Sequence, residues 1–184
     1  MARWSKWKKK IEEFICEDLK DRVEFYATVY RGTHDQRGKV WIELDKKVIF
    51  EANTLEWEIE YYTLSNDIRR INNCVDYNDE KQAQGYYKAY NDAEEILRRK
   101  HKLDEFQFYN AMRRYFNSSF EDSLECEDQL TKIFCLLDKR LGKRRLQDFI
   151  IRRDDSEGLK ILYNVRCQLA EIRSKPIGLE ANES

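Results

Sequence analysis

The sequence predicts an α+β fold in which an N-terminal helix and a three-stranded antiparallel meander precede a predominantly helical lobe. Apolar and polar residues alternate between Arg22 and Ala52, which is the pattern of half-buried strands. Elsewhere apolar residues recur every three or four positions, which is the period of amphipathic helices. The connections within the alternating stretch are short, and short connections favour antiparallel neighbours.

The first element is predicted to be a helix. Ser5 is a favourable N-cap residue, and apolar residues at helical spacing follow it along the chain. This row comprises Trp7, Ile11, Phe14 or Ile15, and Leu19. We expect the row to pack on the apolar face of the sheet.

Three strands are predicted next. The first hairpin loop is the polar stretch Thr33–Arg37, and a turn at Asp45–Lys47 joins the second strand to the third. The side chains expected to face the core are Val23, Phe25, Ala27 and Val29, then Val40, Ile42 and Leu44, and finally Val48 and Phe50.

A long helix is predicted after Asn53, because Asn53 and Glu56 form a capping-box pattern. It carries two apolar rows, which together predict a wide buried face and a central place in the fold. The first row is Trp57, Tyr61, Leu64, Ile68, Ile71 and Val75, and the second is Leu55, Ile59 and Tyr62.

The rest of the chain is predicted to be helical. One helix runs from about Asp79 to about Lys100, and capping patterns begin three further segments. These patterns are Asp104 with Gln107, Ser118 with Glu121, and Asp154 with Glu157.

A chain of 184 residues fits one domain. We predict a single domain over residues 1–178, with the helix and small sheet in 1–52 and the helical lobe in 53–175. The last residues, 179–184, are predicted to be a disordered tail. One proline and six glycines are too few for a flexible linker between domains.

Composition argues against several classes of protein. The net charge of −1 gives no overall attraction to nucleic acid or to an anionic membrane, and no run approaches the ~20 apolar residues of a membrane helix. Five scattered cysteines without a Cys-x-x-Cys pair predict a reduced, cytoplasmic protein. The two histidines lie far apart, so no metal site is predicted, and no motif calls for a cofactor.

One candidate site is an acidic and aromatic surface on the long helix, formed by Glu56, Trp57, Glu60 and Tyr61. Aromatic side chains anchor protein interfaces and acidic ones steer a basic partner, so this pattern favours binding to another protein. The alternative is that lysines elsewhere in the fold neutralise the acids, with Lys46, Lys47 and the N-terminal lysines as candidates.

A second candidate is the basic stretch Lys143, Arg144 and Arg145, which has the charge to hold phosphates of nucleic acid. Its alternative role is pairing with the acidic stretch Glu121–Asp128. A third candidate is the loop pair His34 and Asp35, which has the chemistry of an acid–base pair. The favoured interpretation of that pair is a polar turn stabilised by Asp35.

Five segments are distinctive as a set: Arg3–Lys6, His34–Gln36 leading to Trp41, Leu55–Tyr62, Gly85–Tyr90 and Leu141–Leu146. Together they resemble a family of small bacterial cytosolic proteins with no assigned activity. The resemblance covers nearly the whole chain and implies a bacterial, cytosolic, single-domain protein without implying any functional residue.

The leading hypothesis is a small cytosolic protein-binding module, of the immunity or antitoxin kind, that uses the acidic and aromatic surface. The alternative is a nucleic-acid-associated accessory protein that uses the basic stretches Lys6–Lys10 and Lys139–Arg145. A third hypothesis is an enzyme centred on His34 and Asp35. We expect another protein as the partner, nucleic acid as the second choice, and no membrane.

Overall fold

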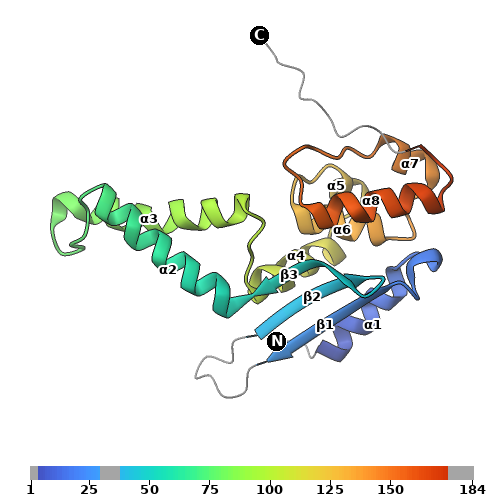
Figure 1. Cartoon of the computed structure of the whole chain (residues 1–184), viewed down its shortest axis with the longest axis horizontal. Helices are drawn as coiled ribbons and strands as arrows, with labels where there is room; N and C mark the ends of the chain where they lie inside the picture. The colour runs from blue at the N-terminus through green and yellow to red at the C-terminus, as the bar shows by residue number, and fades with distance from the viewer. Residues whose placement is uncertain (1–3, 30–37, 174–184) are drawn as a thin grey trace, which may run out of the picture. The chain divides into compact units, whose positions relative to one another are not determined.

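The structure is a computed structural model, and it describes residues 4–29 and 38–173. It confirms the α+β class, with one helix, a three-stranded antiparallel sheet and then mostly helices (Figure 1). The strands are β1 (Val23–Val29), β2 (Gly38–Leu44) and β3 (Lys47–Asn53). The helices are α1 (Trp4–Phe14), the short 3-10 helix η1 (Glu17–Leu19), α2 (Thr54–Ile71), α3 (Glu80–Arg99), α4 (Glu105–Asn117), α5 (Phe120–Leu124), α6 (Gln129–Leu137), α7 (Lys143–Asp148) and α8 (Glu157–Leu169).

The chain divides into two compact units. Unit 1 comprises Met1–Ala27, Trp41–Phe50 and Phe108–Ser184, and unit 2 comprises Thr28–Val40 and Glu51–Gln107. The single domain expected over residues 1–178 stays a prediction. The tail expected at residues 179–184 lies outside the described residues.

The sheet has the order β1-β2-β3, and burial alternates along β2 as the sequence predicts. Burial on β3 does not follow the prediction, because Val48 is 54% exposed while Ile49 and Phe50 are both buried. Successive side chains of a strand point to opposite faces, so β3 is covered on both faces here. On one side Gly158 of α8 comes so close that an added Cβ would lie 1.6 Å from the Ile49 carbonyl oxygen.

Helix α1 buries Trp7, Ile11 and Phe14, as predicted, but it ends at Phe14. The expectation that Leu19 continues its apolar row is therefore wrong. The Cys16 amide donates to the Leu137 carbonyl at 2.9 Å, so the chain pairs with the end of α6 in place of another helical turn. Leu19 is buried from η1 instead.

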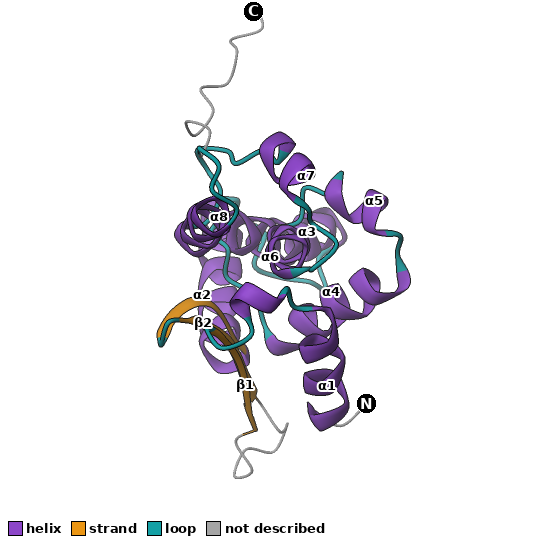
Figure 2. Ribbon diagram, turned by 90° about the vertical axis from the view of Figure 1, so that its right-hand side faces the viewer, coloured by secondary structure: helices purple, strands orange, loops and turns teal. Residues whose placement is uncertain are grey.

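Helix α6 forms the core of unit 1, and Figure 2 shows it between α5 and α8. Every residue from Leu130 to Leu137 is buried. The ring of Phe134 lies 5.4 Å from that of Tyr115 and 5.9 Å from that of Phe108, centroid to centroid. These separations are typical of aromatic pairs in protein cores.

Two predicted helix starts are confirmed. Asn53 accepts a hydrogen bond from the Glu56 amide at 3.4 Å at the start of α2. The capping box before α4 is reciprocal, because the Gln107 amide donates to Asp104 at 2.6 Å and the Asp104 amide donates to the Gln107 side chain at 3.1 Å. Both patterns satisfy amides that a helix leaves unpaired at its start.

Two other predicted starts are wrong. The cap of α5 is Ser119 and not Ser118, and the cap of α8 is Ser156 and not Asp154. The second error has a structural cause in Asp155, which is 4% exposed. Its carboxylate accepts from the Arg152 amide at 2.7 Å, so the segment before α8 is a hydrogen-bonded turn.

In unit 2, α2 and α3 lie side by side as a helical hairpin (Figure 1). The prediction that α2 is central and widely buried is wrong. Its second apolar row is exposed, with Leu55 at 37%, Ile59 at 59% and Tyr62 at 53%. The first row meets α3 at Tyr61, whose ring lies 5.7 Å from that of Tyr90, but its last members are exposed, Ile71 at 78% and Val75 at 61%.

Candidate partner-binding surface

The first half of α2 has a fixed position within unit 2. Its cap Asn53 is itself held, because the Asn53 amide donates to the Leu103 carbonyl at 3.1 Å. Ala52, one residue earlier, pairs with Leu103 in a parallel bridge. The helix therefore starts from a point anchored by two strand-like contacts, and the side chains of its first turns have defined directions.

Three stripes run along this part of α2. We call Leu55, Ile59 and Tyr62 the outer row, and Trp57, Tyr61, Leu64 and Ile68 the inner row. An α-helix turns by about 100° per residue. Glu56 and Glu60 consequently fall between the two rows, so an acidic stripe borders the exposed apolar row.

The two predicted aromatic anchors belong to the inner row and are half-buried. The rings of Trp57 and Tyr61 stack with centroids 4.6 Å apart and an interplanar angle of 15°. Burial, and then the charge of Glu94, raises the pKa of Tyr61. The buried Nε1 of Trp57 has no acceptor among the described residues. Trp57 and Tyr61 therefore pack within the α2–α3 hairpin and expose only part of their rings to solvent.

Lysines engage two of the acids near the start of α2. Glu60 pairs with Lys102, and Glu51 pairs with Lys39 at 2.7 Å. The sequence alone left open whether lysines neutralise these acids. Two of the acids are neutralised here, by Lys39 and Lys102 and not by the lysines expected from the sequence, Lys46, Lys47 and those of the N-terminus. Glu56 is exposed and forms no ion pair with any residue in 4–29 or 38–173.

A small cavity of about 180 Å³ lies beside the start of α2. Its lining residues are Glu51, Asn53, Glu56, Trp57, His101, Lys102 and Leu103. The structure thus brings Glu56 and Trp57 together at one cavity, whereas Glu60 and Tyr61 do not line it. Since α2 is anchored here, the cavity is a defined recess next to the acidic stripe.

The outer row is the part of this surface that sequence reasoning missed as a binding element. Its residues were recognised as apolar and were assigned to the core. A signal against the core was present, because Ile59 stands between Glu58 and Glu60 and Leu55 precedes Glu56. Carboxylates on both sides of an apolar residue are hard to bury together with it.

The basic candidates lie in unit 1. The Arg145 guanidinium donates to Glu121 at 2.7 Å, as the pairing alternative supposes, while Lys143 and Arg144 are exposed. Another arginine, Arg152, pairs with a second residue of the acidic stretch at 2.7 Å. Phosphate binding by Lys143, Arg144 and Arg145 stays a prediction.

His34 and Asp35 lie outside the described residues, so the loop proposed for an enzyme remains untested. The described part of the chain contains no group of three side chains suited to holding a metal ion. Within the same residues, no helix has the length and apolar character needed to span a bilayer. All five cysteines are free thiols, and four of them are buried.

A family model described as the SF0329 protein family matches residues 3–167. The chain belongs to this family. The match spans α1 to most of α8, so it includes the sheet, the α2–α3 hairpin and the core of unit 1. No curated protein and no solved structure matches the chain.

Proposed function

We propose that the protein is a protein-binding module that uses the exposed face of α2. The observation that carries the proposal is the outer row of Leu55, Ile59 and Tyr62, three exposed apolar side chains at helical spacing beside the acidic stripe. A helix that presents apolar residues at i, i+4 and i+7 has the pattern by which helices dock into apolar grooves.

The chemistry of the partner follows from this surface. The apolar row would pack against an apolar strip of the partner. Burying apolar surface in this way stabilises a complex by about 25 cal/mol for each Å² removed from water. Glu56 has no ion pair in the described residues and faces the same side, so it favours a lysine or arginine beside that strip. The partner is therefore a protein with an apolar strip bordered by basic residues.

The class of module proposed is of the immunity or antitoxin kind, acting in the bacterial cytoplasm. Five free cysteines without a disulfide suit a reducing compartment. An acidic docking surface suits such a role, because it complements a basic target and raises the rate of association.

The proposal is tested by capturing partners of the tagged full-length protein from bacterial lysate after nuclease treatment. A discrete protein is expected with the wild type, and Ile59→Ser is expected to reduce its recovery at least about tenfold, a loss of about 1.4 kcal/mol. Ile161→Ser is the matched control, because Ile161 is a similarly exposed isoleucine on α8, at 48%.

Equal recovery with Ile59→Ser and the wild type would remove the outer row from the interface. Adding Glu56→Lys separates steering from anchoring, since it should slow association more than it speeds dissociation. The nucleic-acid alternative would be favoured instead by material that disappears with nuclease, whose binding falls steeply as the salt concentration rises and requires Arg144 and Arg145.

A further inference from the structure

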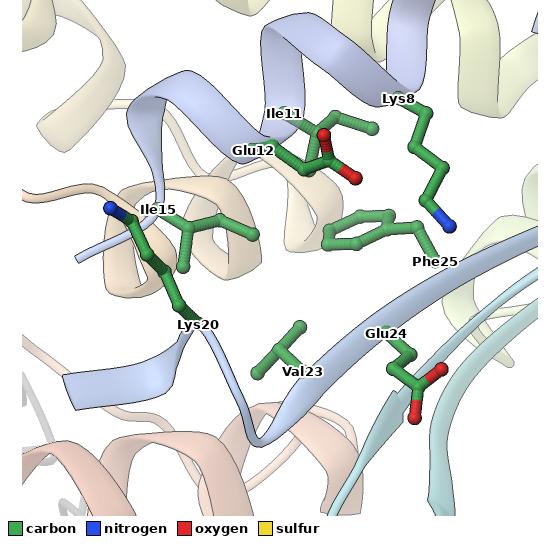
Figure 3. Close-up of a pocket in the computed structure, with 8 residues that line it drawn as sticks. All are labelled: Lys8, Ile11, Glu12, Ile15, Lys20, Val23, Glu24 and Phe25. Atoms are coloured by element: carbon green, nitrogen blue, oxygen red, sulfur yellow. The ribbon is translucent and has the colours of Figure 1, made fainter. Parts of the chain in front are cut away.

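A cavity of about 390 Å³ lies in unit 1, beside α1 and the start of β1 (Figure 3). Its floor consists of four apolar side chains, each no more than 5% exposed: Ile11, Ile15, Val23 and Phe25. Val23 and Phe25 share a face because alternate residues of a strand do. Ile15 follows the end of α1 and lies one turn after Ile11, because its amide donates to the Ile11 carbonyl at 3.1 Å. The floor is therefore apolar and recessed.

Four charged side chains also line this cavity, and two of them are already engaged. The Lys20 ammonium lies 2.6 Å from the Glu17 carboxylate. The Glu24 carboxylate accepts a hydrogen bond from the Tyr26 hydroxyl at 2.6 Å. These two rim residues have local partners within the same unit.

The other two, Lys8 and Glu12, stand one turn apart on α1, on the side of the cavity opposite Val23 (Figure 3). Neither forms an ion pair with a residue in 4–29 or 38–173. Residues at this spacing have Cβ atoms about 5–6 Å apart. Lys8 and Glu12 are therefore neighbouring residues of opposite charge at the edge of an apolar recess.

We propose that this cavity binds the zwitterionic form of an apolar α-amino acid. The carboxylate of the ligand pairs with Lys8, its ammonium pairs with Glu12, and its side chain lies on the apolar floor. A mostly apolar recess with a few polar groups that fix orientation is the general pattern of small-molecule sites. A fatty acid would satisfy Lys8 and leave Glu12 without a counter-charge, so the paired rim favours the zwitterion.

The test is isothermal titration calorimetry of the full-length protein with three matched probes. L-phenylalanine is expected to bind, while N-acetyl-L-phenylalanine and L-phenylalaninamide are expected to bind at least about tenfold more weakly, because each lacks one of the two charges. Glycine, which has no apolar side chain, is expected to give no heat of binding. Equal affinity for phenylalanine and its acetyl derivative would overturn the proposal.

Variants then locate the site. Lys8→Gln and Glu12→Gln are each expected to lower the affinity for L-phenylalanine about tenfold. Lys9→Gln and Glu13→Gln are matched controls, because these exposed residues lie one position further along the chain and do not line the cavity. Absence of binding by both L-phenylalanine and L-leucine at millimolar concentration, or unchanged affinity in Glu12→Gln, would overturn the proposal.

Discussion

Helix α6 of unit 1 and helix α2 of unit 2 show two uses of apolar residues in one chain. Helix α6 has nine residues and buries all of those from Leu130 to Leu137. Helix α2 has eighteen and buries only Thr54, Ser65 and Arg69. The difference teaches that apolar content at helical spacing identifies a helix but does not say whether its apolar side chains lie in a core.

The two helices also differ in how nearby charges are held. At the end of α6, Asp138 is fully buried and accepts hydrogen bonds from Tyr115 and Arg140, each at 2.7 Å. Along α2, Glu56 and Glu60 remain at the surface. A buried carboxylate needs such partners because burial penalises its charge. On α2, Glu60 pairs with Lys102, and Glu56 has no ion pair within residues 4–29 and 38–173.

The largest difference in stability is expected between an alanine substitution on α6 and one on α2. Leu136→Ala on α6 should lower the free energy of unfolding by about 2–5 kcal/mol, since it leaves a cavity in a fully buried site. Ile59→Ala on α2 should change it by less than about 0.5 kcal/mol, because this side chain is 59% exposed. Urea denaturation of both variants measures the difference, and a large loss with Ile59→Ala would place the outer row in a core.

A smaller effect is expected from the buried carboxylate. Asp138→Ala should destabilise the protein by about 2–3 kcal/mol, because the buried Tyr115 hydroxyl loses its acceptor at 2.7 Å and keeps only the longer contact with the Phe134 carbonyl at 3.4 Å. The matched control is Asp45→Ala, which removes an exposed pair with Arg22 and should cost less than about 1 kcal/mol. Denaturant unfolding measures both variants. An equal decrease in the denaturation midpoint for Asp138→Ala and Asp45→Ala would show that the buried pair contributes no more to stability than the exposed one.

The smallest effect concerns the pH dependence of a cap in unit 2. Burial raises the pKa of the Asp104 carboxyl above its ordinary value. A raised pKa means that the folded state holds this proton more tightly, so the contribution to stability is full below about pH 3.9 and is lost as the pH rises through the folded pKa.

Asp104→Asn keeps a capping oxygen and has no charge to bury. It should therefore be more stable than the wild type at pH 7, by less than about 1 kcal/mol, and the advantage should vanish below about pH 4. Thermal unfolding across this range is the measurement. An advantage that grows towards acid pH would contradict the sign of the shift.

Much of the fold was predictable because local pattern controls it. The alternation along β2 and the caps Asn53 and Asp104 depend on residues close in sequence, and all three predictions are confirmed. The end of α1 was not predictable in this way. It depends on the Cys16 amide meeting the Leu137 carbonyl, a contact between residues 121 positions apart.

The candidate surface was predictable in position but not in detail. The acids and aromatics of α2 mark the right helix, yet which of its two apolar rows is exposed depends on where α3 packs. The lysine that engages Glu60, Lys102, lies 42 positions further along the chain, while Lys39 reaches Glu51 from the neighbouring strand β2. Neither pairing follows from the helical period of α2, so that period could not single out these lysines.

The five cysteines have a practical consequence for experiments on either unit. Four are buried. Burial raises the pKa of three of them, Cys16, Cys167 and, to about 12, Cys135, so these three thiols are hardly ionised at neutral pH. Cys126 is only partly buried. A maleimide dye should therefore attach first at Cys126, and the natural chain already carries a single preferred labelling site in unit 1 while the outer row lies in unit 2.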